Sequence, residues 1–465
     1  MATSTQILVI GGGPAGSTAA TLLAREGFDV TLVERETFPR YHIGESLLPS
    51  CLEIFELLGV REKIEAHGFQ RKGGGYFQWG NDSWLLDFSK LSHPYGFQVL
   101  RAEFDQILLE HAKSQGVKVL EGTEVLSLTF EGEQPRSARL LRASDASAES
   151  AQDISFDYLI DASGRAGVMA TRYLKNRHYP DVFQNVALWG YWKGAKRMPN
   201  APEGSIAVEA TEDGWVWAIP LHDDGTSVGF VLHKDALKEK RQHTPSLEQI
   251  LHDAIAQCPL IVDLLQPGEQ VSAIKTEQDF SYIAEHLAGP GYFLAGDAAC
   301  FIDPLLSTGV HLATHGALLA AASLASLLRG EITEDQARAF FEQSYRKAYL
   351  RLVVLISAFY QQYNGRESYF WRAQQLTAND YAHSPALNEA FLFIVSGMED
   401  LKDVQRADQN ISLEEIVQVI PEEEQERTQF MEQVYNVVFT RSSPATAAVD
   451  GLRLATRPHL TIAQA

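Results

Sequence analysis

Cysteine and positive charge are both scarce in this sequence. The three cysteines, Cys51, Cys258 and Cys300, are too few and too widely spaced for a disulfide framework, and they favour a reducing compartment. Lysine and arginine total 39 against 60 aspartates and glutamates, which gives a formal net charge of −21. Nucleic acids and anionic lipids both require basic surface to meet phosphates, so this charge argues against either partner.

Long apolar runs are also lacking. The longest, residues 309–328, is interrupted by His311, Thr314 and His315, so we expect a buried helix there rather than a membrane span. The first six residues are polar and lack the basic start of a secretory signal. These features predict a cytoplasmic protein, and a chain of 465 residues is expected to form two or three domains.

Hydrophobic periodicity predicts an α/β fold. Apolar runs at residues 7–10 and 30–33 flank a small-residue helical pattern at 15–26, which is the order of a βαβ unit. Short runs rich in Trp, Tyr and Val over 186–231 predict a β-sheet, and after residue 332 the pattern is mostly helical. Further strands are expected at 117–120, 158–160 and 292–295.

Three glycines follow the first strand in the spacing G-x-G-x-x-G. Gly11 permits the tight turn, Gly13 lets a pyrophosphate approach the backbone, and Gly16 lets helix and strand pack closely. The helix that begins near Ala15 offers its free N–H groups to the phosphates. Glu34 ends the second strand, where an acidic side chain binds a ribose hydroxyl. A purely structural glycine turn is the alternative.

Two later blocks favour FAD over NAD. Asp161 closes a strand in Asp-Ala-Ser-Gly-Arg, and Gly296 and Asp297 end the run Gly-Tyr-Phe-Leu-Ala-Gly-Asp. A second acidic strand end suits a longer ligand with a ribityl chain. With Arg101 in Leu-Arg-Ala-Glu-Phe-Asp, these blocks resemble those of flavoprotein aromatic hydroxylases and their relatives. For Asp161 the alternative is a helix or turn cap.

A tryptophan motif separates halogenation from hydroxylation. The run from Trp215 to Pro220 matches the W-x-W-x-I-P signature of flavin-dependent halogenases, and Trp215 and Trp217 point to the same side of a strand. In that family the two indoles wall the flavin off from a bulky substrate. A core strand with an aromatic stripe is the alternative. Lys72, before three glycines, matches the lysine that halogenases of phenols and pyrroles require, whereas alone it resembles a solvated loop.

The segment that ends in Ser-Thr-Gly-Val also resembles the halogenases. The resemblance assigns halide binding to the backbone amides of Thr308 and Gly309, and flavin contacts to Pro304, Gly309 and Val310. A helix N-terminus with a glycine offers bare N–H groups to an anion, which is the same chemistry. A simple N-cap by Ser307 or Thr308 is the alternative, and both readings are compatible.

A further match covers residues 39–49, which resemble the flavin-pocket segment of the family. Arg40, Gly44, Glu45 and Ser46 are the expected cofactor contacts, with a helix-start role as the alternative for Glu45. The resemblance extends to about residue 375.

One position departs from a branch of the family. Halogenases of free tryptophan carry a glutamate just before the Ser-Thr-Gly run, where this chain has Leu306. A phenol or pyrrole is activated by its own heteroatom and does not need that carboxylate. The phenol/pyrrole branch is therefore favoured and free tryptophan is disfavoured.

The resemblance implies a Rossmann-like FAD-binding domain of the aromatic-hydroxylase type, an inserted β-sheet substrate domain and a helical C-terminal region. The expected boundaries are 1–70, 98–170 and 275–330 for the FAD-binding domain, 71–97 and 171–274 for the substrate domain, 331–440 for the helical region and 441–465 for a flexible tail.

The resemblance also implies a reaction. A separate flavin reductase supplies FADH2, oxygen forms a flavin hydroperoxide, and chloride or bromide is oxidised to hypohalous acid. The acid passes Trp215 and Trp217 and reaches Lys72, which acts as a hydrogen-bond donor or as a chloramine. An aromatic substrate of natural-product biosynthesis is then halogenated, and no metal is expected. A flavin-dependent aromatic hydroxylase is the main rival, followed by an isoprenoid reductase and a catalytically silent flavoprotein.

Substrate delivery is left open between a free aromatic and one tethered to an acyl or peptidyl carrier protein. A carrier is typically acidic, so docking needs a local basic surface. Lys234, Lys238, Lys240 and Arg241 supply one candidate, whose alternative is a solvated helix face. The aromatic segment 359–371 is expected to cover the substrate entrance.

Overall fold

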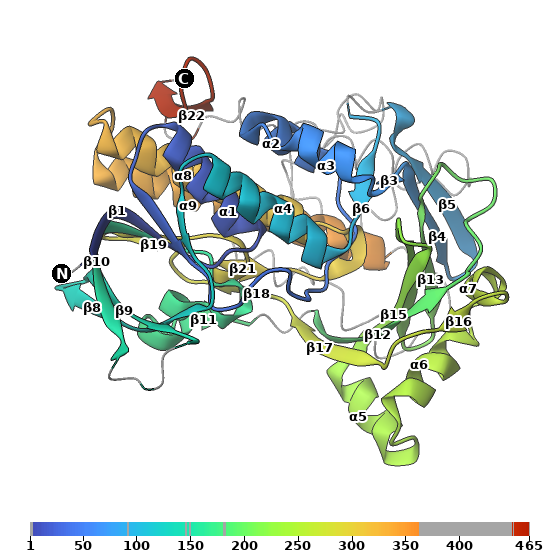
Figure 1. Ribbon diagram of the computed structural model, residues 1–465. Coiled ribbons are helices and arrows are strands. Elements are labelled where there is room, and N and C mark those ends of the chain that lie inside the picture. The colour runs from blue at the N-terminus through green and yellow to red at the C-terminus, as the bar shows by residue number, and fades with distance from the viewer. Residues whose placement is uncertain are drawn as a thin grey trace, which may run out of the picture.

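The structure is a computed structural model, and it describes residues 3–90, 93–144, 147, 150–179, 183–361, 449 and 451–464. Two large mixed sheets organise this part of the chain. Figure 1 shows the first sheet on the left, around β1 and β10, and the second on the right, around β4 and β15. The α/β fold expected from the sequence is confirmed.

The first sheet contains the predicted βαβ unit. Strand β1 pairs in parallel with both β2 and β10, and helix α1 (Pro14–Arg25) connects β1 to β2. In sheet order the strands are β19 (Ala288–Gly289), β20 (Tyr292–Leu294), β10 (Gln152–Asp161), β1 (Thr3–Ile10), β2 (Val30–Val33) and β7 (Lys118–Leu120), with β9 (Gln134–Arg142) and β8 (Thr123–Glu131) continuing from β10. The carboxyl ends of β1, β2 and β10 therefore meet at one edge, where parallel sheets bind nucleotides.

The second sheet combines strands from separate parts of the chain. Its order is β16 (Glu269–Gln270), β12 (Gln184–Lys193), β15 (Gly225–His233), β14 (Gly214–Pro220), β13 (Ile206–Thr211), β4 (Gly74–Trp79) and β5 (Asp82–Asp87), and β17 (Lys275–Phe280) also pairs with β12. Both faces are covered. Val216 and Ala218 of β14 belong to a core cluster that includes residues of α6 and α7, whereas Trp215, Trp217 and Ile219 belong to the main core.

The remaining helices are α2 (Ser50–Leu58), α3 (Arg61–His67), α4 (Arg101–Ser114), α5 (Lys234–His243), α6 (Leu247–Ile255), α7 (Pro259–Leu265), α8 (Gly309–Leu328) and α9 (Glu334–Gln361). The smaller strand groups are β3 (Gln70–Lys72) with β6 (Gly96–Gln98), β11 (Arg177–His178) with β18 (Tyr282–Ala284) and β21 (Cys300–Phe301), and β22 (Leu452–Ala455) with β23 (Thr461–Gln464).

Helix α8 is the central helix of the core. Within the described residues it alone is long and apolar enough to cross a membrane, but 89% of its most apolar window is buried inside the fold. It packs against α1, α2 and α9, and its length lies behind α1 and α4 in Figure 1. The interruption of this run by polar residues thus marks a core helix, as expected.

The C-terminal end differs from the expected flexible tail. Residues 452–464 form the β22–β23 hairpin, and Leu452, Leu454, Leu460 and Ile462 are buried. Their alternation of apolar and polar side chains places one face of the hairpin against the core, including α8. Residues 362–448, which hold most of the expected helical region, lie outside the described residues.

Candidate active site

The glycine turn after β1 has no room for side chains. Gly11 has a φ of +104°, and a Cβ built there would lie 2.2 Å from the carbonyl oxygen of Ala162. A Cβ at Gly16 would lie 1.8 Å from the carbonyl oxygen of Gly11. Gly13 begins α1, where no side chain caps the helix and the first turn holds no acidic residue. The free N–H groups of this helix end fit a pyrophosphate.

The acidic end of β2 lies beside this turn. Glu34 is buried, its Oε2 accepts from the backbone N–H of Gly12 at 2.7 Å, and its Oε1 accepts from that of Glu36 at 2.8 Å. A carboxylate at the carboxyl end of a parallel strand, next to a glycine turn, has the placement expected for a ribose contact.

The turn at Gly296 and Asp297 packs against the glycine turn that follows β1. Gly296 has a φ of +62°, and a Cβ there would lie 2.9 Å from the Cβ of Ala15 in the first turn of α1. The carboxylate of Asp297 next to it lies 3.9 Å from Nε of Arg165. Two distant stretches of the chain therefore form one continuous surface, which fits an extended dinucleotide such as FAD.

A buried ion-pair group holds the predicted flavin-pocket segment. Arg101 donates to both carboxylate oxygens of Asp105 at 2.8 and 2.9 Å, and Arg40 donates to the same carboxylate at 3.0 Å. Burial alone would raise the pKa of Asp105, but the charges of Arg101 and Arg40 outweigh it and hold that pKa below its usual value. Arg101 also donates to the carbonyl oxygens of Ile43 and Gly44, which ties α4 to this segment.

Asp161 takes the alternative role that the sequence left open. It is fully buried at the end of β10, its Oδ1 accepts from the N–H of Ser163 at 3.0 Å, and its Oδ2 accepts from that of Met169 at 2.7 Å. Both oxygens thus close the turn after the strand. The capping role is therefore present in the structure, and the cofactor contact of Asp161 stays a prediction.

Lys72 is a buried amine between two hydroxyls. Its side chain is 3% exposed, and Nζ donates to Oγ of Ser46 at 2.8 Å and to Oγ of Ser307 at 3.3 Å. Burial lowers the pKa of Lys72 to about 7. Within the described residues no carboxylate lies at ion-pair distance from this ammonium, and the interaction with Cys51, which raises the pKa, does not outweigh burial.

The predicted halide segment lies directly beside Lys72. Thr308 is fully buried, and its hydroxyl has no hydrogen-bond partner among the described residues. Gly309 begins α8, Val310 is buried in its first turn, and the short 3-10 turn Pro304–Leu306 precedes it. Ser307 has a φ of +59°, which turns the chain sharply into the helix. An unpaired buried hydroxyl at a helix N-terminus fits a small anion.

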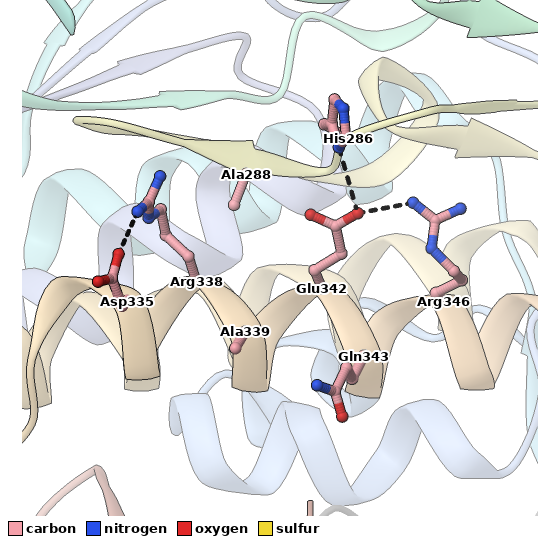
Figure 2. Close-up of a pocket in the computed structure, with 8 residues that line it drawn as sticks. All are labelled: His286, Ala288, Asp335, Arg338, Ala339, Glu342, Gln343 and Arg346. Atoms are coloured by element: carbon pink, nitrogen blue, oxygen red, sulfur yellow. Dashed lines mark hydrogen bonds and ion pairs between the residues drawn. The ribbon is translucent and has the colours of Figure 1, made fainter. Parts of the chain in front are cut away.

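A small apolar cavity adjoins Lys72. Its volume is about 10 Å³, close to what one water needs. The lining residues are Leu48, Lys72, Gly75, Phe77, Leu86, Phe88, Ile206, Leu305, Leu306 and Ser307. A wider groove of about 470 Å³ lies far along the chain, between β19 and α9, where Glu342 faces Arg346 and His286 (Figure 2). None of the predicted site residues lines that groove.

The two indoles of the tryptophan motif lie on the same face of the strand, as their spacing predicts. Trp215 and Trp217 are buried on the same side of β14, with ring centroids 5.9 Å apart. Nε1 of Trp215 donates to the hydroxyl of Tyr360 at 2.8 Å, and Nε1 of Trp217 donates to Oγ of Ser227 at 3.3 Å. Hydrogen bonds at both indole nitrogens fix the ring positions.

Asp303 supports the halide segment and was missed by sequence reasoning. It is fully buried, its Oδ1 accepts from the N–H of Leu305, and its Oδ2 accepts from the side-chain amide of Asn185 at 2.8 Å. The hydroxyl of Tyr360 lies 3.1 Å from both oxygens. Tyr360 thus connects Trp215 to this turn. The Asp-Pro pair after a strand was the available signal, since aspartate before proline favours a capped turn.

Glu45 ends a chain of hydrogen bonds that sequence reasoning also missed. Tyr191 donates to its Oε1 at 2.8 Å, the hydroxyls of Tyr191 and Tyr41 are 2.9 Å apart, and Trp189 donates to Tyr41 at 2.6 Å. Burial raises the pKa of Glu45 to about 7, although Tyr191 and Arg101 oppose the change. A carboxyl whose pKa is raised by burial therefore lies next to Ser46, the partner of Lys72.

A family model and two similar proteins indicate the same kind of flavoprotein. Residues 4–346 match the FAD binding domain family. A tryptophan 2-halogenase of Chondromyces crocatus is 51% identical over 409 residues, covering 87% of this chain and 78% of the relative. The flavin-dependent halogenase armH2 of Armillaria mellea is 40% identical over 433 residues, covering 89% and 81%.

Solved structures agree. The myxobacterial chondrochloren halogenase CndH has a TM-score of 0.75 at 34% identity, covering 94% of this chain and 97% of that one. The flavin-dependent halogenase CmlS has a TM-score of 0.78 at 30% identity, covering 99% and 84%. With the glycine turn, the two buried tryptophans of β14 and the buried lysine in one fold, the chain belongs to the flavin-dependent halogenases, enzymes that use FAD and a halide.

Proposed function

We propose that this enzyme transfers chlorine or bromine to an electron-rich aromatic ring at Lys72. The observation that carries the proposal is the placement of the Lys72 ammonium, 3.3 Å from Oγ of Ser307, whose chain neighbour Thr308 has a buried hydroxyl without a hydrogen-bond partner. A halide bound at Thr308 and Gly309 would lie next to the only lysine buried among the described residues. The proposed halide site and the proposed halogenating lysine are therefore neighbours.

The FAD site would be formed by both glycine blocks, Glu34 and the segment around Arg101. When bound, reduced flavin and dioxygen supply the oxidising equivalents that turn halide into an electrophilic halogen. We expect a separate reductase to deliver the reduced flavin, because the one glycine fingerprint that follows a strand is accounted for by FAD.

Lys72 would hold the halogen electrophile in reach of the substrate. As an ammonium it donates a hydrogen bond, and as a neutral amine it accepts the halogen to form a chloramine. A pKa of about 7 makes both forms abundant near neutral pH. Trp215 and Trp217 would keep a bulky aromatic away from the flavin.

The substrate we propose is a ring activated by its own oxygen or nitrogen. Leu306 is 3% exposed and lines the cavity at Lys72, where its side chain offers no charge to stabilise a ring cation. Phenols and pyrroles meet this condition. The relative named a tryptophan 2-halogenase is said to act on an indole, and carbon 2 of indole belongs to its pyrrole ring. Indoles attacked at that carbon therefore join the candidates, and Leu306 does not exclude tryptophan.

Delivery of the substrate by a carrier protein is a separate proposal, and it depends on a basic surface on helix α5. Lys238 and Arg241 are exposed there. Lys240 instead pairs with Asp213 at 2.6 Å, which fits a solvated helix face. The candidate docking surface is thus reduced to Lys238 and Arg241, supplemented by the half-buried Lys234.

The test is the mass of the product. The purified enzyme is given reduced FAD, oxygen and a panel of phenols, pyrroles and indoles, first with chloride and then with bromide. A product whose isotope pattern follows the halide supports the proposal. A product that gains oxygen under both conditions would identify an aromatic hydroxylase instead.

A further inference from the structure

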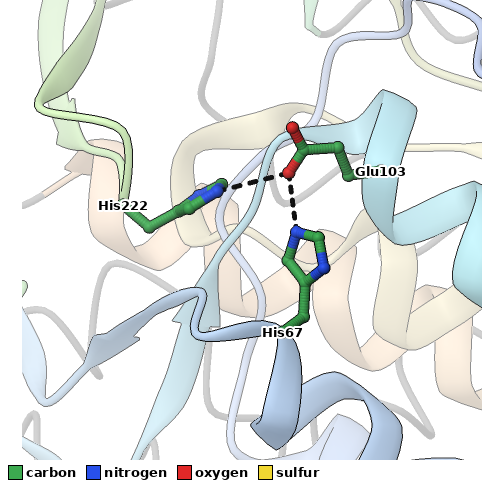
Figure 3. A group of neighbouring side chains, drawn as sticks. All are labelled: His67, Glu103 and His222. Carbon is green, nitrogen blue, oxygen red and sulfur yellow. Dashed lines mark hydrogen bonds and ion pairs between the residues drawn. The ribbon is translucent and has the colours of Figure 1, made fainter.

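Three side chains outside the flavin and lysine sites point their ligand atoms at one another. His67 ends α3, Glu103 lies in the first turn of α4, and His222 follows β14. Nε2 of His67 is 2.8 Å from Oε2 of Glu103, and Nε2 of His222 is 3.2 Å from the same oxygen. Figure 3 shows both rings directed at this carboxylate from different elements.

The two imidazoles are held in place by Phe69. Its ring lies 4.3 Å from that of His67 in a tilted stack and 5.2 Å from that of His222, edge to face. Phe69 is 4% exposed, so it is a fixed support. Because the rings are already oriented, an ion bound between them would cost little side-chain entropy.

The donor set matches a divalent transition metal. Two imidazole nitrogens and one glutamate oxygen are a set that zinc sites use, and the same set suits cobalt and nickel. Bonds of about 2.0–2.1 Å in a tetrahedron separate the donors by roughly 3.3 Å. The observed 2.8 and 3.2 Å are close to that spacing, and all three atoms lie within 4.8 Å of one another.

The surroundings leave a coordination position for water. The three side chains are 33%, 38% and 20% exposed, so the site opens to solvent. In the described part of the chain no lysine or arginine pairs with Glu103. The carboxylate charge is therefore not neutralised by a permanent cation.

We propose that His67, Glu103 and His222 bind one divalent transition metal ion of the Zn²⁺ class. The ion would connect two elements of the active site. Glu103 stands two residues after Arg101, which holds the flavin-pocket segment, and His222 stands two residues after Pro220, which ends the tryptophan motif. A bound metal thus fixes α4 relative to β14. The three ligands all come from the protein and include none of the residues proposed to bind FAD or halide.

The experiment measures metal binding alone. Tag-free, metal-free full-length protein without flavin is titrated with ZnCl2 by calorimetry and with CoCl2 by visible absorption, where tetrahedral Co²⁺ gives intense bands. We expect one ion per chain. His67→Ala, Glu103→Gln and His222→Ala should each weaken binding by at least about tenfold, since even outer-shell changes cost this much.

The control is His286→Ala, which removes a histidine 3.9 Å from one carboxylate, Glu342, and should leave Zn²⁺ affinity unchanged. Glu103→Gln keeps the side-chain shape, so its fold, checked by circular dichroism, is retained. Zn²⁺ should raise the melting temperature of the wild type and not of Glu103→Gln. Absence of binding by the wild type, or binding by all three variants with the affinity of the wild type, would overturn the proposal. Either result leaves the halogenation test unaffected.

Discussion

The ammonium of Lys72 donates to the hydroxyl of Ser46 across 2.8 Å, joining two motifs 26 residues apart in sequence. Ser46 belongs to the flavin-pocket segment and Lys72 to the strand that precedes the glycine run. The contact therefore connects the proposed flavin site to the proposed halogenation site through a single hydrogen bond. It also fixes the position of an amine whose pKa is lowered by burial.

Lys72→Ala should abolish halogenation while oxygen still oxidises the reduced flavin, because the amine is not part of the FAD site. Mass spectrometry of the product measures the loss of halogenation, and absorbance measures the reoxidation of the flavin. Lys72→Arg keeps a donor and a cation but does not readily form a chloramine. Substantial activity of that variant would exclude an obligatory chloramine, and full activity of Lys72→Ala would remove Lys72 from the site.

Lys72→Met should stabilise the fold most at low pH. A fall in pKa from 10.5 to about 7 corresponds to roughly 5 kcal/mol at most, before the bonds to Ser46 and Ser307 are counted. Since the unfolded chain binds this proton more tightly, the cost is fully present below pH 7 and disappears as pH rises toward 10.5. Melting curves of both proteins at pH 6.5 and pH 10 check this. An equal gain at both pH values would contradict it.

Tyr360→Phe should weaken halide use while leaving FAD binding intact. The change removes the acceptor of the Trp215 indole and a hydroxyl next to Asp303, and a buried unpaired donor costs about 1–3 kcal/mol. The KM for bromide should rise severalfold with little change in the Kd for FAD. Tyr349→Phe, another buried tyrosine of α9, is the matched control. Equal effects of the two variants would mean that Tyr360 only fills space.

NADPH alone should not reduce the bound FAD efficiently. The glycine turn of Gly11, Gly13 and Gly16 is assigned to FAD, and no second fingerprint follows a strand in the sequence. Anaerobic stopped-flow absorbance of the FAD-loaded enzyme with NADPH measures the rate, and an added flavin reductase is the positive control. Rapid bleaching without the reductase would favour a hydroxylase mechanism.

Reversal of Lys238 and Arg241 to glutamate should slow turnover of a carrier-tethered substrate and spare a free one. Both residues are exposed on α5, and added salt should mimic the change if the attraction is electrostatic. Lys118→Glu, an exposed lysine on β7, controls for net charge. Efficient halogenation of the free aromatic that is unaffected by the reversal would leave carrier docking without support.

The sequence predicted the parts of the site that depend on local spacing. The glycine turn needs three glycines at fixed offsets because backbone atoms approach them closely, and Trp215 and Trp217 share a face because strands alternate. Asp303 and Tyr360 could not be predicted, since their contact joins residues 57 apart through the tertiary fold. The capping role of Asp161 depends on the position of the amide of Met169, which local sequence does not reveal. The terminal hairpin was missed because its strands have only four residues each and are held in place by tertiary packing, including that of β23 on α8.

That hairpin ties the last residues of the chain to the first helix. Glu26 accepts from the backbone N–H of Leu460 at 3.0 Å across 434 residues, and its other oxygen accepts from Arg329 at 2.9 Å. The contact at Glu26 therefore forms only after residue 460 has been synthesised. At about 5–20 residues per second, the 434 positions that separate the two partners take roughly 20–90 s to translate. A chain that stops before residue 460 would lack this hydrogen bond to the end of α1.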